Sequence, residues 1–139
     1  MNKALLDTDT YSEILKAANP TVIRHASEYR RRHGTLTVSA VTVMEIVYGF
    51  QRNQNSRRHQ EFLAAVALEE VLPFDRAAAE LAGRIASDLD GTGQTIGMAD
   101  PMIAAIALIH GMELVTGNTA HFDRVAQLGY PLRLANWRN

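Results

Sequence analysis

Two aspartates stand two residues apart in "LLDTDT", residues 5–10, directly after a short apolar run. Side chains alternate along a strand, so Asp7 and Asp9 would leave the edge of a sheet on the same side. Such a pair suits three kinds of site: a phosphatase nucleophile with its acid/base partner, a set of metal ligands, or a loop that caps the next helix. The pair alone leaves all three open.

Two further carboxylates, Glu45 and Asp100, lie within apolar stretches of the sequence. A buried charge is costly unless a positive group neutralises it, and neither residue has a lysine or arginine beside it in the sequence. A divalent cation would neutralise them. Carboxylate oxygens together with the amide of Asn118 suit Mg²⁺ or Mn²⁺ better than zinc.

Each of these polar residues also has a purely structural explanation, because short polar side chains are the usual caps of helix N-termini. The candidate caps are Asp7 or Thr8, Thr42 with Glu45 as a capping box, Asp100 before Pro101, and Asn118 before Thr119. The histidines show no metal-ligand spacing and are expected at the surface or at helix ends; they are His25, His33, His59, His110 and His121.

Composition narrows the class of protein. The chain has 139 residues, a net charge of −1 and no cysteine, which excludes disulfides, thiolate zinc sites and a cysteine nucleophile. No apolar run is long enough to span a membrane and no signal peptide is recognisable, so a cytoplasmic location is expected. A general nucleic-acid coat would be more basic. Six of the twelve arginines nevertheless fall into two clusters, within residues 30–33 and 52–59, which are either solvated helix ends or contacts for a nucleic-acid backbone.

Alternating short strands and helices predict a single α/β domain over residues 1–139, with a mostly parallel central sheet of four to five strands between two layers of helices. Ligands of such sheets bind beyond the carboxyl ends of the strands, where Asp7, Glu45 and Asn118 are expected. Strands are predicted at 3–6, 35–39, 69–73, 112–117 and 130–134. Helices are predicted at 8–18, 20–33, 42–52, 56–67, 76–89 with Asp75 as its N-cap, 100–111 and 119–129.

Four segments, in order and with the usual separations, resemble the motifs of PIN-domain ribonucleases of the VapC toxin type, including the FitB-like branch. They are "ALLDTDTYSEILK", "TVSAVTVMEIVYGF", "ADPMIAAIALIHG" and "MELVTGNTAHFDRV". The match spans essentially the whole chain. Haloacid-dehalogenase-like phosphatases fit less well: they need Thr or Val where this chain has Tyr11, and a late lysine where none follows Lys16.

The resemblance implies a PIN-like three-layer fold and an endoribonuclease in which Mg²⁺ or Mn²⁺ activates water. By motif position, Asp7, Glu45 and Asp100 are the principal metal-binding and catalytic residues. Asn118 takes the fourth acidic position, where a neutral amide would hold a second metal less tightly. Thr116 would orient a water or a phosphate, and Asp9 would support the turn. Arg30, Arg31, Arg52 and Arg57 are candidates for guiding the RNA backbone.

The same resemblance implies two protein partners: a cognate antitoxin and a second copy of the chain in a homodimer. The apolar faces of residues 11–18 and 22–29 are candidate antitoxin contacts, although helical spacing also makes them core candidates. Two alternatives remain at this stage. One is the phosphatase built on Asp7 and Asp9, and the other is a non-catalytic binding module with a PIN-like fold.

Overall fold

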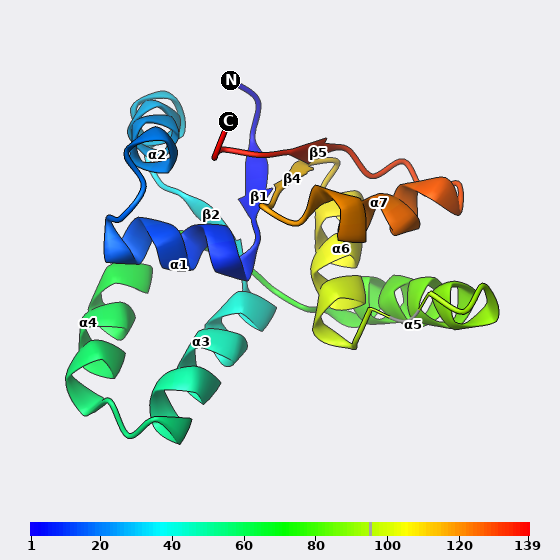
Figure 1. Cartoon of the computed structure of the whole chain (residues 1–139), viewed down its shortest axis with the longest axis horizontal. Coiled ribbons are helices and arrows are strands. Elements are labelled where there is room, and N and C mark those ends of the chain that lie inside the picture. The colour runs from blue at the N-terminus through cyan, green and yellow to red at the C-terminus, as the bar shows by residue number, and fades with distance from the viewer. Residues whose placement is uncertain (95) are drawn as a thin grey trace.

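The computed structural model describes residues 1–94 and 96–139, and short parallel strands form the middle of this part of the chain (Figure 1). β1 (Ala4–Leu6), β4 (Glu113–Val115) and β5 (Leu134–Ala135) form one ladder, in which Leu5 is opposite Leu114 and Val115 is opposite Ala135. β2 (Thr37–Ser39) and β3 (Glu70–Leu72) form a second ladder. All three strand pairs are parallel, as the sequence predicts.

The predicted sheet is divided between β1 and β2, although these two strands are neighbours. The hydroxyl group of Tyr29 lies between them: it accepts from the Ala4 N–H at 3.1 Å and is 3.2 Å from the Ala4 carbonyl oxygen. It is also 2.9 Å from the hydroxyl of Thr37. A side chain therefore uses backbone groups of β1 that would otherwise be free to pair with β2.

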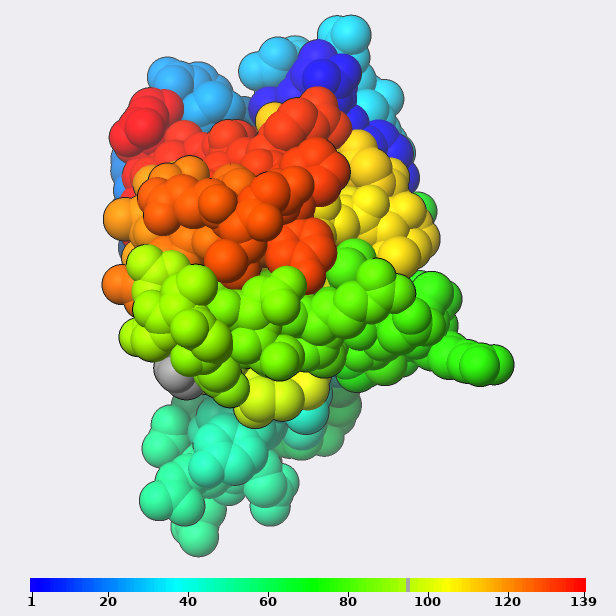
Figure 2. Space-filling model, turned by 90° about the vertical axis from the view of Figure 1, so that its right-hand side faces the viewer, coloured from blue at the N-terminus to red at the C-terminus, as the bar shows by residue number. Residues whose placement is uncertain are grey.

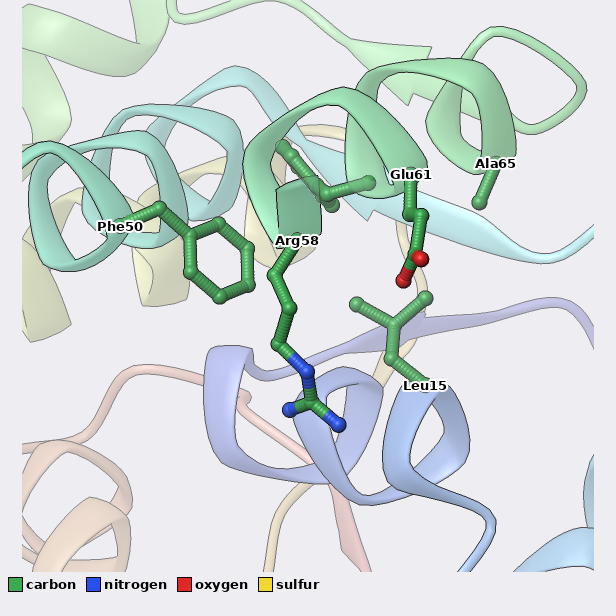
Figure 3. Close-up of a pocket in the computed structure, with 6 residues that line it drawn as sticks. Leu15, Phe50, Arg58, Glu61 and Ala65 are labelled. Carbon is green, nitrogen blue, oxygen red and sulfur yellow. The ribbon is translucent and has the colours of Figure 1, made fainter. Parts of the chain in front are cut away.

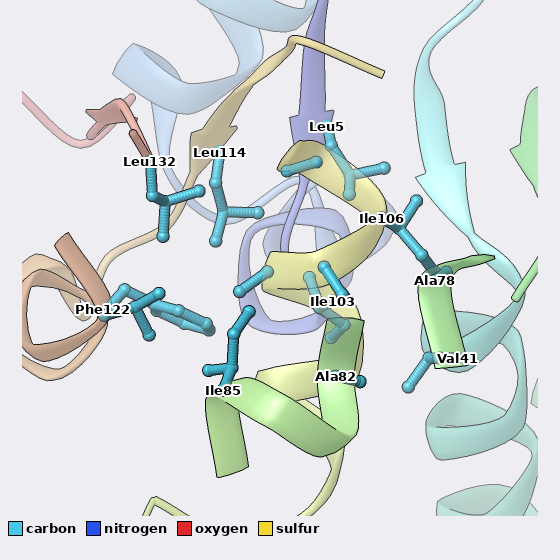
Figure 4. Close-up of a cluster of buried hydrophobic side chains, with 14 of the residues drawn as sticks. Leu5, Val41, Ala78, Ala82, Ile85, Ile103, Ile106, Leu114, Phe122 and Leu132 are labelled. Atoms are coloured by element: carbon cyan, nitrogen blue, oxygen red, sulfur yellow. The ribbon is translucent and has the colours of Figure 1, made fainter. Parts of the chain in front are cut away.

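Alternating strand residues build two cores, one on each side of the strands. Leu5 and Leu114 pack with α5 (Arg76–Gly91), α6 (Ala99–Ile109) and α7 (Thr119–Gln127), as Figure 4 shows. Leu6 and Val115 belong to the opposite core, which includes residues of α1 (Thr8–Lys16), α2 (Pro20–His33), α3 (Ala40–Arg52) and α4 (Ser56–Val66). The predicted three-layer α/β/α arrangement is therefore confirmed.

The helix boundaries follow the sequence closely, except at two N-termini. Asp75 caps α5 as predicted, by accepting from the Ala78 N–H at 3.0 Å. α3 begins two residues earlier than predicted because Ser39 supplies the cap, accepting from the Thr42 N–H at 3.1 Å. α6 has Met98 at its N-cap with no side-chain bond, so Asp100 lies inside the first turn. The proposed Thr42–Glu45 capping box and Asp100 cap are therefore wrong.

α3 and α4 form a helical hairpin that projects from the rest of the molecule (Figure 1). Seen from the side of α5 and α7, the turn between α3 and α4 extends beyond the body of the domain (Figure 2). Within residues 1–94 and 96–139, none of the helices is both long and apolar enough to cross a membrane.

Candidate active site

Residues from four distant segments line one open depression of about 330 Å³. Asp7 follows β1, Glu45 lies in the second turn of α3, Asp100 lies in the first turn of α6, and Asn118 follows β4. Thr8, Asp9 and Phe122 complete the lining. The depression lies beyond the carboxyl ends of β1 and β4, where the topology rule for parallel sheets places ligands.

Asp7 is held rigidly at the bottom of this site. Its side chain caps α1: Oδ1 accepts from the Thr8 N–H at 2.7 Å, and Oδ2 accepts from the hydroxyl of Thr116 at 2.9 Å. The Asp7 N–H continues the ladder by donating to the Val115 carbonyl at 2.8 Å. The residue is only 7% exposed. Capping and site formation are thus two roles of one carboxylate.

The environment of Asp7 disfavours its charge. Its pKa is raised from the ordinary 3.8 to about 7, first because of burial and then because of the neighbouring Asp9 carboxylate. Hydrogen bonds from Thr116 and Thr8 act in the opposite direction and lower the pKa. Among the described residues, Asp7 forms no ion pair within 4.0 Å. A buried carboxylate with no positive side chain beside it fits a ligand for a cation.

Glu45 is tied to α1. The Thr8 hydroxyl donates to Glu45 Oε1 at 2.6 Å, and it is 3.0 Å from the hydroxyl of Thr42. This bond fixes Glu45 toward the depression, away from the backbone of its own helix. Within the described part of the chain, the hydrogen bonds leave Oε2 as a free acceptor.

Asp100 has a side-chain partner that the sequence analysis did not predict. His121 Nε2, in the first turn of α7, lies 2.8 Å from Asp100 Oδ2. Burial raises the pKa of Asp100, while the hydrogen bond from His121 lowers it. His121 is a helix-end residue, as expected, but its contact with Asp100 was not predicted. The "HF" pair of the fourth motif was the available signal, but spacing alone could not connect positions 100 and 121.

Thr116, Asn118 and Asp9 lie around this set of carboxylates. Thr116 is fully buried; its hydroxyl donates to Asp7 and accepts from the Asn118 N–H at 3.0 Å. Asn118 is the N-cap residue of α7, but its side chain makes no capping bond. Asp9 accepts from the Thr10 N–H at 2.8 Å, and its other oxygen lies 3.5 Å from Arg138. Asp9 therefore differs from Asp7 in being paired.

The four predicted RNA-contacting arginines are not brought to the depression. Arg30 pairs with Glu69 at 2.7 Å, and the neighbouring His33 bonds the Met1 carbonyl, which places this end of α2 at the amino edge of the strands. Arg31 is exposed on the same helix end. Arg52 and Arg57 flank the turn between α3 and α4, where Arg57 lies 3.9 Å from Glu61.

The donor set fits a hydrated divalent cation better than a closed metal cage. Within residues 1–94 and 96–139, no three aspartate, glutamate or histidine side chains are close enough to enclose an ion by themselves. Mg²⁺ usually keeps several waters and takes only one or two carboxylates. Asp7, Glu45, Asp100 and Asn118 supply only oxygen ligands around an open space, as that coordination requires.

Comparison with known proteins identifies the class. Residues 4–128 match the PIN domain family. A tRNA(fMet)-specific endonuclease VapC from Shigella flexneri is 34% identical over 129 residues, which cover 92% of this chain and 96% of that protein. The chain therefore belongs to the PIN-domain family and, with this relative, to its VapC ribonucleases. The predicted family, fold class and enzyme class are confirmed, and the phosphatase alternative is wrong.

Solved structures agree over nearly the whole chain. The DNA-bound VapBC complex from Salmonella typhimurium contains a chain that matches with a TM-score of 0.81 at 29% identity, covering 99% of both chains. FitAcB from Neisseria gonorrhoeae matches with a TM-score of 0.76 at 26% identity, covering 96% of this chain and 97% of the other. The fold is therefore also similar to that of the Fit complex, as the resemblance to the FitB-like branch implied.

Proposed function

We propose that this protein hydrolyses RNA phosphodiester bonds in the acidic depression, with Mg²⁺ or Mn²⁺ as cofactor, as the toxin of a toxin–antitoxin pair. The observation that carries the proposal is the meeting of Asp7, Glu45 and Asp100 from three distant segments in one open depression. The membership of this chain in the VapC ribonucleases supports the same reaction. We propose that the protein acts in the cytoplasm, where it would meet both RNA and an antitoxin made in the same cell.

When bound, the divalent cation supplies an activated water and stabilises the charge that develops on the phosphate oxygens. Asp7 and Asp100 would hold the cation, and Thr116 and His121 fix the orientation of these two carboxylates. Glu45 is anchored through Oε1, so its Oε2 would be available to orient the attacking water or to accept a proton from it. The mechanism requires no nucleophilic side chain.

Metal removal tests the proposal. We expect the wild type to cleave RNA with Mg²⁺ or Mn²⁺ and to lose this activity in EDTA, with recovery when metal is restored. Asp100→Asn is expected to be inactive but as well folded as the wild type by circular dichroism, because the amide keeps the side-chain volume. Cleavage that persists in EDTA would refute the metal mechanism. A wild type that binds RNA but never cuts it would favour the non-catalytic binding module.

The specificity of the Shigella relative suggests the first substrate to try. That protein is a tRNA(fMet)-specific endonuclease, and its identity to this chain extends over nearly the full length. We propose a structured RNA of the tRNA class as substrate, with initiator tRNA as the first probe. Mapping the cut ends on a denaturing gel, beside elongator tRNAs, tests this assignment.

We propose that a segment of the cognate antitoxin lies in a groove between α1, α3 and α4. The groove is lined by Leu15, Ile46, Phe50 and Arg58 among others, and it shares Thr8 and Glu45 with the acidic depression. Figure 3 shows its outer part, where Arg58 extends from α4 toward α1 and Leu15 lies opposite Glu61. The solved VapBC and FitAcB structures support a protein partner of this kind.

The groove corrects the predicted antitoxin contacts. α1 contributes Leu15, which is 36% exposed, as the sequence analysis expected of residues 11–18. The apolar face of α2 is instead core, since Val22, Ala26 and Tyr29 are fully buried. Helical spacing could not distinguish these two faces because both follow the same period.

Leu15→Glu tests the groove. We expect it to lower the affinity for the antitoxin by about tenfold or more, because it places a charge in a partly apolar contact. Leu68→Glu is the matched control: it changes a 75% exposed leucine outside the groove and should leave the complex intact. Co-expression with the cognate antitoxin, followed by affinity measurement, compares the two variants. Equal affinities would exclude this groove.

A homodimer is also proposed. Met44 and Tyr48 are 57% and 66% exposed and stand four residues apart, on one face of α3. Exposed apolar side chains on the same helix face favour a protein contact. Size-exclusion chromatography with light scattering determines whether the free protein is a dimer or a monomer.

A further inference from the structure

Arg138, the penultimate residue, lies at the rim of the acidic depression although it comes from the far end of the chain. Its Nε donates to Glu13 Oε2 at 2.8 Å, and its Nη2 is 3.5 Å from Asp9 Oδ2. Asp9 itself lines the depression. The guanidinium side chain is 38% exposed, so it is both anchored and open to a ligand.

The fold places this arginine by two neighbouring contacts. β5 pairs with β4, and the Thr116 N–H donates to the Ala135 carbonyl at 2.9 Å, which brings the C-terminal segment beside the site. Trp137, directly before Arg138, is 4% exposed and stacks on His25 with 5.7 Å between ring centroids. The backbone position from which the Arg138 side chain extends is therefore fixed.

Gly117 forms the floor beneath the guanidinium. A β-carbon at this position would lie 1.8 Å from Nη1 and 2.4 Å from Cζ of Arg138. No other residue type leaves room for the arginine in this position. Because the obstacle is the end of a flexible side chain, an alanine at 117 would displace Arg138 without requiring the backbone to move.

The charge distribution explains why a cation is needed here. Asp7, Asp9, Glu45 and Asp100 surround the depression, and an RNA strand is a polyanion that such a surface repels. Among the described residues, no ion pair joins the arginine clusters on α2 and at the turn between α3 and α4 to these acids. Arg138 does pair with one of them, Asp9. It is therefore well placed to attract a phosphate to this rim.

The hydrogen-bonding pattern leaves the useful end of the guanidinium available. Glu13 engages Nε, while Nη2 makes only the long 3.5 Å ion pair and no hydrogen bond of the described residues uses Nη1. A phosphate can bind Nη1 and Nη2 through two parallel hydrogen bonds when Nη2 exchanges its long contact with Asp9 for the phosphate. The anchor at Nε limits the side-chain entropy lost when the phosphate binds.

We propose that Arg138 is a substrate-binding residue that holds a backbone phosphate of the RNA next to the cleaved bond, with Glu13 as its anchor and Gly117 as its floor. This inference rests on the proposed ribonuclease function. It adds a contact from the C-terminus that the four predicted arginines do not provide.

The test compares kcat and KM for initiator tRNA in the wild type, Arg138→Gln and Gly117→Ala. The control is Arg32→Gln, which changes an exposed arginine at the amino edge of the strands. We expect KM to rise about tenfold in both Arg138→Gln and Gly117→Ala, with kcat within about twofold of the wild type, because one charge-assisted contact is lost. Arg138→Lys should recover part of the loss, since it keeps the charge but not the paired geometry. Arg32→Gln should match the wild type.

A second measurement separates substrate binding from a structural role. In Arg138→Gln, the slope of log(kcat/KM) against log salt should become shallower by about 0.7 to 0.9, the release of one counterion. An unchanged KM and slope, or a lower kcat with a lower melting temperature alone, would overturn the proposal. If the wild type cuts other RNA but not tRNA, the proposed substrate class fails instead, and if it cuts no RNA, the proposed function fails. Fluorescence anisotropy of labelled tRNA on an Asp100→Asn background then still decides whether Arg138 contributes to binding.

Discussion

Asp7→Ala should lower kcat/KM for RNA cleavage by about 1,000-fold or more, whereas Asp9→Asn should change it by less than about threefold. Asp7 is buried between Thr8 and Thr116 and has no ion pair among the described residues, so its charge is available to a cation. The two carboxylate oxygens of Asp9 contact the Thr10 N–H and Arg138. The two aspartates thus look alike in sequence and differ in environment.

The measurement is steady-state cleavage of initiator tRNA with Mg²⁺ or Mn²⁺, accompanied by a thermal melt of each variant. Loss of the Asp7 cap costs about 1 kcal/mol, while removal of a disfavoured buried charge stabilises the fold, so Asp7→Ala should remain folded. An unfolded Asp7→Ala would indicate that capping is its main role. Equal losses in both variants would indicate that the two aspartates work as a pair.

The strands and the acids at their ends were predictable from the sequence because both depend on local pattern. β-Branched runs locate β2, and the parallel arrangement places Asp7, Glu45 and Asn118 at one edge. Asp100 precedes its neighbouring strand by a whole helix, so the topology rule did not place it; the cost of a buried charge and the family resemblance joined it to the others. The structure then brings it to the same depression.

The contacts that orient these acids could not be predicted, because they join side chains far apart in sequence. Thr8 meets Glu45 across 37 positions, and His121 meets Asp100 across 21. Arg138 reaches Glu13 across 125 positions. The hydrophobic periodicity of a sequence does not reveal such contacts. They depend on how α1, α3, α6 and α7 pack around the strands, which is a property of the whole fold.

The division of the sheet between β1 and β2 also depends on a contact between residues far apart in sequence. The period-2 pattern indicates that a segment is a strand, but it does not say which groups satisfy the backbone of that strand. Here the hydroxyl of Tyr29, on α2, takes that role at Ala4. The same helix leaves its arginines at the amino edge of the strands, far from the carboxyl edge where the acids lie. One helix therefore accounts for both departures from the sequence expectation.

The metal-free protein should lose stability as the pH rises, because the folded state holds the Asp7 proton more tightly than the unfolded state. The pKa of Asp7 is about 7 in the fold and 3.8 when unperturbed. Between these values the folded protein binds more protons, so the free energy of unfolding falls with increasing pH. The full decline is on the order of 4 kcal/mol at pH 8, and Asp100, whose pKa is also raised, acts in the same direction.

Urea unfolding in EDTA at pH 5 and pH 8 measures the part of this decline that falls above pH 5, about 3 kcal/mol. Asp7→Asn is the matched variant because it keeps the side-chain volume without the charge. We expect most of the decline to disappear in Asp7→Asn, so that at pH 8 the variant is more stable than the metal-free wild type. Mg²⁺ or Mn²⁺ should restore the wild type at pH 8 by binding only the folded state, and should affect Asp7→Asn much less. An identical pH profile for both proteins would place the disfavoured charge elsewhere. The cost of the buried carboxylate and the affinity for the cation are then two measurements of one property, the negative charge that the fold concentrates around Asp7.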